Sequence, residues 1–492
     1  MIAAPLWALL ACAGHPPPAS TAQPPAASDR ASRPEPVATT VPPADPAAGR
    51  AELIYFVLVD RFANGDPSND TASPGPPVDR SDPQGWHGGD LRGVIDHLDH
   101  ISSLGTTRLW LSPVFRTRTE PIGEWGAYHG YWQWDPTTVE PRFGTRAELV
   151  ELAEALRSRR MGLLLDLVTN HVGYDAPVLH AHPDWFHDTP SIEDWQDPVQ
   201  LEQWQVHGLP DIDQDNPEAA AWLTNAALAW QALLHPTGFR VDAVRHVPNE
   251  FLARLGARLG AGHPTWWLGE DFQGSPAALA DSQRTGGFTH VFDFPLYYAM
   301  TEVFCDRASP SRIASVLYQD RLYDRPQGLV TFLDNHDLPR IASRCHEDPG
   351  TVRRALLFLL ATRGVPALTY GTEVGLTGAR EPDNRADMRF DGDIYGSMIR
   401  SLMVERTAHP SLRVGRQRVI ALGPEHVAIA RVHDDDAAVI GVNIGSEPVA
   451  LPLPPLLADG DPVRRMTVQR ESPLVIDAPD PPDPPGAPRE LP

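Results

Sequence analysis

Three carboxylates, Asp242, Glu270 and Asp337, each stand just after a short apolar run of the chain. Runs of this length and composition are typical of strands buried on both faces. Carboxylates held together at strand ends can serve as nucleophile, general acid or general base, provided that their protonation states differ. Further polar groups follow other runs of this type, namely Asp60-Arg61, Asp166 with Asn170-His171, and Asn335-His336. A solvated loop would explain any one of these positions, but their recurrence at five run ends favours one shared site.

Eight apolar runs, separated by amphipathic stretches, predict the elements that position these groups. The clearest helical patterns between them cover 146–160 and 217–234. Strands that alternate with helices predict an α/β fold, a (β/α)₈ TIM barrel, in which active sites form at the carboxyl ends of the strands. The predicted strands are 54–59, 108–111, 162–167, 238–241, 266–268, 290–292, 329–333 and 366–369.

The barrel is predicted in two parts, 51–171 and 215–412, separated by an insertion after the third strand. The connection at 172–214 is rich in Asp, His and Trp, and connections this long are usually functional. We expect it to form a small subdomain over the barrel mouth. Short β-type runs at 426–432 and 438–443 predict a C-terminal antiparallel β-sandwich over 413–476.

Both ends of the chain differ in composition from this body. Residues 1–12 form an apolar run that ends in Leu9-Leu10-Ala11-Cys12, which resembles a lipoprotein signal with Cys12 as the lipidated residue. No Lys or Arg precedes the run, so an apolar N-terminus without a signal function is the alternative. Segments 13–50 and 477–492 are rich in Pro and predict disorder. We therefore expect an exported protein, secreted or held in the cell envelope, in which Cys305 and Cys345 are able to pair.

The formal net charge of −23 limits the partners of the chain. A charge of this sign argues against nucleic acid and against an anionic membrane face, so we expect membrane contact only through an N-terminal lipid anchor. A neutral polymer is compatible with it, and we expect a monomer. Aromatic residues suited either to stacking on sugar rings or to core packing cluster at Trp125, Tyr128, Tyr131, Trp132 and Trp134.

Six motifs occur in an order that carries more information than any one of them. Together they resemble the signature regions of the α-amylase family, glycoside hydrolase family 13, from about residue 54 to the mid-400s. The motifs are Asp166-Leu-Val-Thr-Asn170-His171, Leu209-Pro-Asp211-Ile-Asp213, Gly238-Phe-Arg240-Val-Asp242-Ala-Val-Arg245-His246, Gly269-Glu270-Asp-Phe, Phe332-Leu-Asp-Asn335-His336-Asp337 and Gly364-Val-Pro-Ala-Leu-Thr-Tyr-Gly-Thr-Glu373.

The resemblance implies a catalytic role for each carboxylate: Asp242 as nucleophile, Glu270 as general acid/base, and Asp337 as the group that binds sugar hydroxyls. Cleavage with retention needs the first two carboxyl groups about 5–5.5 Å apart. Arg240, two residues before Asp242, would project to the same side of its strand and keep that carboxylate ionised. The residues assigned by resemblance to substrate binding are Arg240, His171, His336, Tyr131, His129, Arg245, His246 and Arg385.

The resemblance also implies two Ca²⁺ sites built from oxygen ligands, which Ca²⁺ prefers. Asn170, Asp213 and the backbone carbonyl of His246 match a structural site between barrel and subdomain. A second loop near the first strand resembles the calcium loop of cyclodextrin glycosyltransferases and cyclomaltodextrinases, although an ordinary Asx-rich turn would use the same residue types. Its residues are Asn64, Asp66, Asn69, Asp70, Gly88 and Asp90.

Three functions are compatible with these residues. The leading hypothesis is a retaining hydrolase of α-1,4-glucosidic bonds in starch-like glucans. The second is a cyclomaltodextrinase or 4-α-glucanotransferase with the same machinery, because acceptor-side residues such as Arg245, His246 and Phe272 decide whether water or a sugar attacks. Arg245 replaces a common Lys, and Glu381 replaces an Asp that binds donor-side sugar in cyclodextrin glycosyltransferases. The third, a glycan-binding lipoprotein without catalysis, predicts the loss of a catalytic carboxylate that this chain retains.

Overall fold

Eight parallel strands close into a barrel at the centre of the protein. A computed structural model describes residues 45–47, 49–262, 264–434, 436–451 and 474–476. The order around the barrel is β1-β10-β9-β8-β7-β6-β5-β2, which confirms the predicted (β/α)₈ fold class. The strands are β1 (Ile54–Val57), β2 (Arg108–Leu111), β5 (Gly162–Leu167), β6 (Gly238–Val241), β7 (Trp266–Gly269), β8 (His290–Phe292), β9 (Leu329–Thr331) and β10 (Val365–Thr369).

Most barrel strands are buried along their whole length, as the apolar runs of the sequence predicted. Two strands end earlier than predicted. The chain leaves β1 in a 3₁₀ turn at Val59–Arg61. It leaves β9 after Thr331, and the carboxylate of Asp334 then accepts a hydrogen bond from the backbone N–H of Ile341. Both early ends replace strand pairing with a turn that carries polar residues towards the barrel mouth.

The register of three neighbouring strands places polar residues at the same level along the barrel axis. Asp166 on β5 pairs with Arg240 on β6. Asp242 follows Arg240 by two residues, so both side chains project to the same side. Gly269, the last residue of β7, pairs with Val241, and Glu270 therefore leaves β7 at the level of Asp242. The sequence spacing thus becomes a spatial cluster through strand pairing alone.

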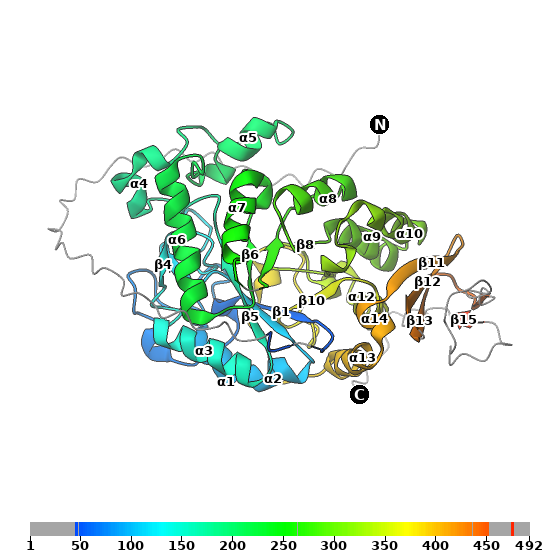
Figure 1. The fold of residues 1–492 in the computed structure, drawn as a ribbon. Helices are drawn as coiled ribbons and strands as arrows, with labels where there is room; N and C mark the ends of the chain where they lie inside the picture. The colour runs from blue at the N-terminus through cyan, green and yellow to red at the C-terminus, as the bar shows by residue number, and fades with distance from the viewer. Residues whose placement is uncertain (1–44, 48, 263, 435, 452–473, 477–492) are drawn as a thin grey trace. The chain divides into compact units, whose positions relative to one another are not determined.

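Helices follow the strands and cover the outside of the barrel (Figure 1). The predicted helix at 217–234 is confirmed with the same bounds, and the one at 146–160 ends two residues early, at Ser158. The helices outside the insertion are α1 (Leu91–Asp96), α2 (Leu98–Ser103), α3 (Arg146–Ser158), α6 (Pro217–Leu234), α7 (Asn249–Leu259), α8 (Pro276–Thr285), α9 (Phe294–Cys305), α10 (Ser311–Tyr318), α11 (Ile341–Arg344), α12 (Pro349–Ala361), α13 (Gly396–Ala408) and α14 (Pro410–Val414).

The long connection between β5 and α6 folds as short helices joined by turns. It contains α4 (Pro177–Ala181) and α5 (Pro198–Gln203), and an isolated antiparallel bridge joins His171 to Asp211. A separate hairpin of β3 (Phe115–Thr117) and β4 (Gln133–Val139) lies beside it, because the backbone N–H of Gly173 donates to the carbonyl oxygen of Gln133. The hairpin and the connection therefore meet just after the end of β5.

The described C-terminal residues form antiparallel sheets. One sheet has the order β11-β12-β13 and a second pairs β14 with β15; residues 452–473, within the predicted sandwich, lie outside the described part. The predicted boundary at 413 falls inside α14, so the β-rich part begins at Arg416. The strands are β11 (Arg416–Leu422), β12 (His426–His433), β13 (Asp436–Asn443), β14 (Val449–Leu451) and β15 (Leu474–Ile476).

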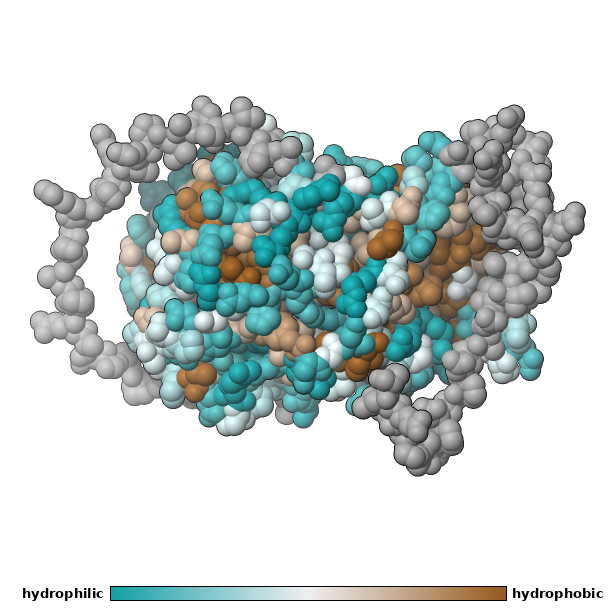
Figure 2. Space-filling model, turned by 90° about the horizontal axis from the view of Figure 1, so that it is seen from below, coloured by the Kyte–Doolittle hydropathy of each residue, from teal (hydrophilic) through white to brown (hydrophobic). Residues whose placement is uncertain are grey.

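The face drawn in Figure 2 mixes hydrophilic and apolar residues, and apolar residues gather on the side where Figure 1 shows β11–β13. In this part of the chain Val414, Val419 and Leu422 are exposed. Among the described residues, no helix combines the length and hydrophobicity that a membrane crossing requires. The structure joins Cys305 to Cys345 in a disulfide, the pairing that the sequence left open.

The predicted disorder of 13–50 is wrong at its C-terminal end. Asp45 forms an ion pair with Arg108 at 2.6 Å, and Ala47 is fully buried. Arg50 donates to the carbonyl oxygens of Arg160 and Gly105. These contacts fix the segment despite its Pro- and Ala-rich composition. The predicted signal at 1–12, the linker up to residue 44 and the tail at 477–492 lie outside the described residues and stay predictions.

Candidate active site

The guanidinium of Arg240 contacts carboxylates from three strand ends. It is fully buried, and its Nη1 lies 2.9 Å from Oδ1 of Asp166 and 2.7 Å from Oδ1 of Asp242. Its Nη2 lies 2.6 Å from Oε1 of Glu270. Burial alone would lower the pKa of Arg240, but the surrounding carboxylates raise it well above its ordinary value. A permanent cation therefore holds three acidic groups in one place. The contact between Arg240 and Asp242 was predicted from their spacing in the sequence.

Glu270 lies in a setting that favours its protonated form. Burial raises its pKa to about 8, against the opposite effect of Arg240, and the charges of Asp242 and Asp337 raise it further. The backbone N–H of Ala243 donates to Oε2 of Glu270 at 3.3 Å. A carboxyl group that keeps its proton near neutral pH can act as a general acid. Burial and the nearby negative charges thus give Glu270 the setting that a general acid needs.

Asp337 differs from Glu270 because it is more exposed and has cationic or polar partners of its own. Its side chain is 38% exposed, with Oδ1 lying 3.0 Å from Nη2 of Arg385 and Oδ2 lying 3.1 Å from Nε2 of His336. Burial would raise its pKa, but His336 and Arg385 lower it below the ordinary value. Arg385 also pairs with Glu381 at 2.5 Å. Asp337 is thus an ionised acceptor that faces solvent, as a group that binds substrate hydroxyls should.

Three imidazoles surround these carboxylates in neutral form. Burial lowers the pKa of His336 to about 3 and also lowers those of His171 and His129. The ring of Tyr131 stacks on that of His336 at a centroid distance of 5.0 Å, and its hydroxyl donates to Asp166 at 3.0 Å. Neutral imidazoles both donate and accept hydrogen bonds, which suits the hydroxyls of a sugar.

Two predicted substrate-binding residues make their contacts away from the carboxylates. Arg245 donates through Nη2 to the carbonyl oxygen of Trp195, and Nδ1 of His246 lies 2.8 Å from the carbonyl oxygen of Leu201. Both partners belong to the long connection, so Arg245 and His246 join β6 to this insertion. Their assignment to substrate binding stays a prediction.

Asp166 and Trp110 belong to the cluster but were not among the predicted site residues. Asp166 accepts from Arg240, from Tyr131 and, at 3.0 Å, from Nε1 of Trp110. Burial raises its pKa to about 6, against the effect of Arg240. The position of Asp166 at a predicted strand end could have indicated from the sequence that it belongs to the cluster. For Trp110, inside an apolar strand, the sequence offered no signal beyond core packing.

Oxygen atoms converge where the first Ca²⁺ site was predicted, but the carboxylate is Asp211 rather than Asp213. The side-chain oxygen of Asn170 faces the carbonyl oxygen of His246 at 2.7 Å and Oδ1 of Asp211 at 3.2 Å. Three acceptors this close repel one another unless the amide is turned or a cation lies between them. The donor set fits Ca²⁺, which binds carboxylate, amide and backbone oxygens.

Asp213 has a different role, which corrects the prediction. Its Oδ1 accepts from the backbone N–H groups of Asp215 and Asn216, just before α6 begins, so it stabilises that turn. Asp211 is fully buried, whereas Asp213 is partly exposed. Among the described residues no three His, Cys, Asp or Glu side chains converge as a metal site. A cation at Asn170 would therefore depend on amide and backbone oxygens with a single carboxylate.

The second predicted loop also holds oxygens in a form that fits a cation. The side-chain oxygens of Asn64 and Asn69 are buried and have no hydrogen-bond partner among the described residues. Asp90 is fully buried and accepts from the backbone N–H groups of Gly65, Asp66 and Gly93. An Asx-rich turn accounts for Asp90 but leaves the two amide oxygens without a partner.

Comparison with known sequences identifies the family. The family model described as "Alpha amylase, catalytic domain" matches residues 56–258 and 312–408, which together make up more than half of the chain. The chain belongs to the α-amylase family of glycoside hydrolases. This membership confirms the resemblance drawn from the six motifs and the prediction of a glycoside hydrolase acting on α-glucans.

Individual members of the family share the fold and part of the sequence. The β/α-amylase of Paenibacillus polymyxa is 34% identical over 80% of this chain, which spans only 33% of that protein's length. A cyclomaltodextrinase of Bacillus sp. is 28% identical, over 82% of this chain and 74% of its own. The structure of an Anoxybacillus α-amylase superposes with a TM-score of 0.79 at 33% identity, covering 87% of this chain and 96% of the other.

Proposed function

We propose that this enzyme hydrolyses α-1,4-glucosidic bonds of starch-like glucans with retention of configuration. The proposal rests most directly on Arg240, which holds Asp242 and Glu270 in one cluster while the two carboxyl groups differ in setting. Glu270 is held protonated by burial, and Asp242 lies 2.7 Å from a guanidinium that stabilises its charge. Retaining cleavage needs this pairing of an ionised and a protonated carboxyl group.

The first step forms a covalent intermediate. An oxygen of Asp242 attacks the anomeric carbon of the bound glucosyl unit and forms an ester bond. The bond from that carbon to the leaving oxygen breaks, and the proton of Glu270 moves to this oxygen. Asp337 accepts hydrogen bonds from hydroxyls of the same sugar, because it is ionised and exposed beside His336 and Arg385. Hydrogen bonds that strengthen as the sugar ring distorts towards the transition state lower the activation barrier of the step.

The second step returns the enzyme to its starting state. Glu270, now ionised, takes a proton from water while the water oxygen attacks the anomeric carbon. The ester bond to Asp242 breaks and the carboxylate is released beside Arg240. The two inversions give net retention. Asp166 takes no part in bond making; it neutralises and orients Arg240 from the neighbouring strand.

Calcium belongs to the proposal as a structural ion. Asn170, Asp211 and the carbonyl oxygen of His246 would hold one ion between the end of β5, the long connection and the turn after β6. Asn64, Asp66, Asn69, Asp70, Gly88 and Asp90 stay the candidates for a second ion. An ion bound at the first site would supply positive charge that fixes the loops carrying His171 and Arg245. It would do no chemistry on the substrate.

A product profile on starch, pullulan and cyclodextrins tests the function. Shortened linear maltooligosaccharides from starch are the expected result for the wild type, with none from Glu270→Gln at the same protein concentration. Starch binding without cleavage by the wild type would instead support a glycan-binding lipoprotein, and no binding or cleavage of any glucan would contradict both.

A cyclomaltodextrinase or a 4-α-glucanotransferase is the second candidate, favoured by the likeness to the cyclomaltodextrinase described above. The same intermediate would then form from a cyclodextrin, or be attacked by a sugar hydroxyl in place of water. Addition of glucose or maltose as acceptor separates these activities. Products longer than the substrate identify transfer, and faster cleavage of cyclodextrins than of starch identifies the cyclomaltodextrinase.

The N-terminal run gives a separate proposal on location. Leu9-Leu10-Ala11-Cys12 supports export and lipidation at Cys12, which would tether a monomeric enzyme to the cell envelope. Labelling of cells with an alkyne fatty acid tests this. Incorporation into the wild type but not into Cys12→Ser is expected, and equal labelling of both would contradict it. Light scattering after size exclusion tests the monomer.

A further inference from the structure

A pocket of about 640 Å³ lies outside the catalytic cluster, between β4, the long connection and α6. Its volume falls in the range of small-ligand pockets, about 300–1,000 Å³. None of the catalytic carboxylates or their direct partners lines it. The lining residues are Arg116, Trp134, Asp135, Thr138, Pro177, Val178, Ala181, His182, Trp185 and Trp222.

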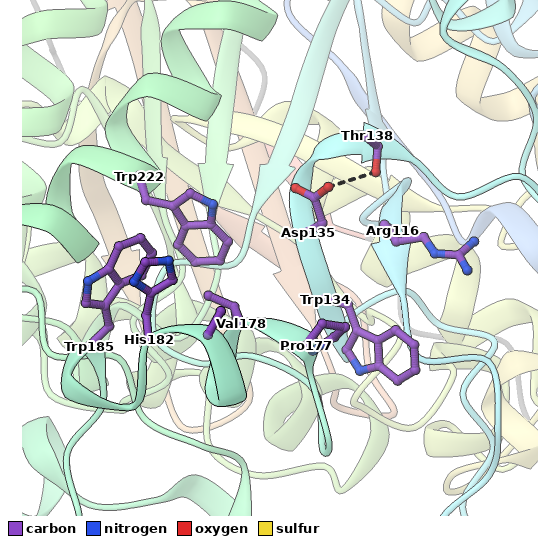
Figure 3. A pocket seen from close by; sticks show the side chains of 10 residues that line it. Arg116, Trp134, Asp135, Thr138, Pro177, Val178, His182, Trp185 and Trp222 are labelled. Carbon is purple, nitrogen blue, oxygen red and sulfur yellow. Dashed lines mark hydrogen bonds between the residues drawn. The ribbon is translucent and has the colours of Figure 1, made fainter. Parts of the chain in front are cut away.

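Aromatic rings form two opposed walls of this pocket. Figure 3 shows Trp134 on one side and Trp222, His182 and Trp185 on the other. His182 stacks on Trp185 with ring centroids 3.9 Å apart, and Trp185 lies 5.8 Å from Trp222. Trp134 is held in place because its Nε1 donates to the carbonyl oxygen of Tyr174 at 3.0 Å. The half-buried Trp134 and Trp222 thus offer fixed rings to a ligand between them.

The polar groups at the pocket select the kind of ligand. Asp135 lies above the gap between the rings, and its Oδ2 accepts from Thr138 at 3.1 Å (Figure 3). Arg116 also lines the pocket, but its charge is paired, because Nη1 donates to Ser73 at 2.6 Å and to the carboxylate of Glu140. A carboxylate beside an arginine that is already paired with Glu140 disfavours anions. Hydrogen-bond acceptors beside aromatic faces suit a neutral ligand with both hydroxyls and apolar ring faces, which describes a sugar.

The hairpin connects this pocket to the active site. Tyr131, whose hydroxyl contacts Asp166, stands two residues before the start of β4, and Trp134 and Asp135 are the second and third residues of that strand. The amide of Gln133 donates to the carbonyl oxygen of Val168 at the end of β5, so this part of β4 is anchored to the barrel. A polymer bound at Trp134 is therefore held on the element that also carries Tyr131.

We propose that the pocket between Trp134 and Trp222 is a second glucan-binding site, which holds a segment of the α-glucan chain away from the bond that is cleaved. The identity of the ligand rests on the proposed function, whereas the existence of the site rests on the pocket itself. The glucosyl rings pack against the indoles. The carboxylate of Asp135 accepts hydrogen bonds from sugar hydroxyls, and the hydroxyl oxygen of Thr138, which donates to Asp135, can accept another.

Titration of maltoheptaose into the full chain carrying Glu270→Gln, followed by calorimetry, tests the site. Two binding events are expected, one at the catalytic cluster and one in the pocket. Trp222→Ala should weaken the pocket event by about fivefold or more, as loss of an aromatic contact does. Ala181→Trp, at an exposed position on the pocket wall, should block the event without removing any native contact. Tyr318→Ala is the matched control, because Tyr318 is 71% exposed on α10.

Each outcome of these titrations decides a different point. Two unchanged events in both pocket variants would overturn the second site and leave the proposed hydrolysis untouched. A lower melting temperature with unchanged affinities would show that the rings only pack, which also overturns it. Binding that depends on Trp222 in a protein whose wild type cleaves no glucan would contradict the proposed function and support the site.

Discussion

At the residue scale, Arg240 shows how one buried cation can serve two carboxyl groups in different protonation states. Asp242 lies against Nη1 and Glu270 against Nη2, yet burial with two nearby carboxylates raises the pKa of Glu270 to about 8. The group with the raised pKa carries a proton below that value and loses it as the pH rises through it. Glu270 is therefore an acid at neutral pH, and its partner is free to be the nucleophile.

The activity should consequently decline on the alkaline side as Glu270 loses its proton. We expect kcat/KM of the wild type on maltooligosaccharides to fall about tenfold per pH unit above the pKa of Glu270. A maltosyl fluoride needs no proton on its leaving group. The alkaline fall in kcat/KM, the alkaline limb of the pH profile, should therefore be much shallower with this substrate. pH profiles with both substrates measure this. Equal alkaline limbs for the two substrates would assign the titration to another group.

The site residues differ in how much of their role the sequence reveals. Asp242, Glu270 and Asp337 follow apolar runs, and this position alone predicted that they would meet. Asp211 and Asp213 stand two residues apart in one motif, and alternation cannot separate them because it places both on one side. Only the approach of Asn170, which comes from another strand end, decides that Asp211 faces it.

At the element scale, the barrel strands set the height of each catalytic group and the long connection holds the strand ends together. Asn170 follows β5, His246 follows β6, and Asp211 belongs to the connection. Their three oxygens meet at one point. A cation there would couple the position of the connection to that of β6, which carries Arg240 and Asp242.

The calcium content of variants tests this arrangement. We expect two ions bound to the wild type and one bound to Asp211→Ala, whereas Asp213→Ala should keep both because the hydrogen bonds of Asp213 are made within the turn before α6. Metal analysis after dialysis measures the stoichiometry. At a free Ca²⁺ concentration 100 times Kd, each ion adds about 2.7 kcal/mol to the free energy of unfolding. Loss of an ion from Asp213→Ala but not from Asp211→Ala would contradict the correction.

The disulfide fastens the segment after β9 to α9. Cys305 ends α9 and Cys345 follows α11, and the residues between β9 and α11 include Asp337. Replacement of both cysteines by Ser should lower the free energy of unfolding by ~2–4 kcal/mol, because the unfolded chain regains its freedom. Urea unfolding with and without dithiothreitol measures this. A wild type insensitive to dithiothreitol and equal in stability to the double variant would contradict it.

Element types were easier to predict than their ends. Short apolar runs, several of them continuously apolar, predicted all eight barrel strands, because strands buried on both faces leave a strong pattern. The early end of β9 depends on the contact between Asp334 and Ile341, and the order of residues 45–50 depends on the pairing of Asp45 with Arg108. Such single tertiary contacts leave no periodic pattern in a sequence.

At the scale of the whole molecule, the barrel strands hold the catalytic cluster, the connection and hairpin meet just after β5, and a net charge of −23 leaves a neutral polymer as the compatible partner. The hairpin and the residues just before β4 contribute Tyr131 to the catalytic cluster and Trp134 to the pocket. Under the two proposals made above, the enzyme holds a glucan chain at two places and cleaves it at one, by way of an ester with Asp242.

The anomeric configuration of the first product tests the central claim most directly. Proton NMR during the first minutes of maltoheptaose cleavage by the wild type resolves the α- and β-anomers before mutarotation mixes them. Double displacement through Asp242 predicts that the α-anomer appears first and that the β-anomer grows in later. If the β-anomer appears first, water attacks the sugar directly, and the assignment of Asp242 as nucleophile is wrong.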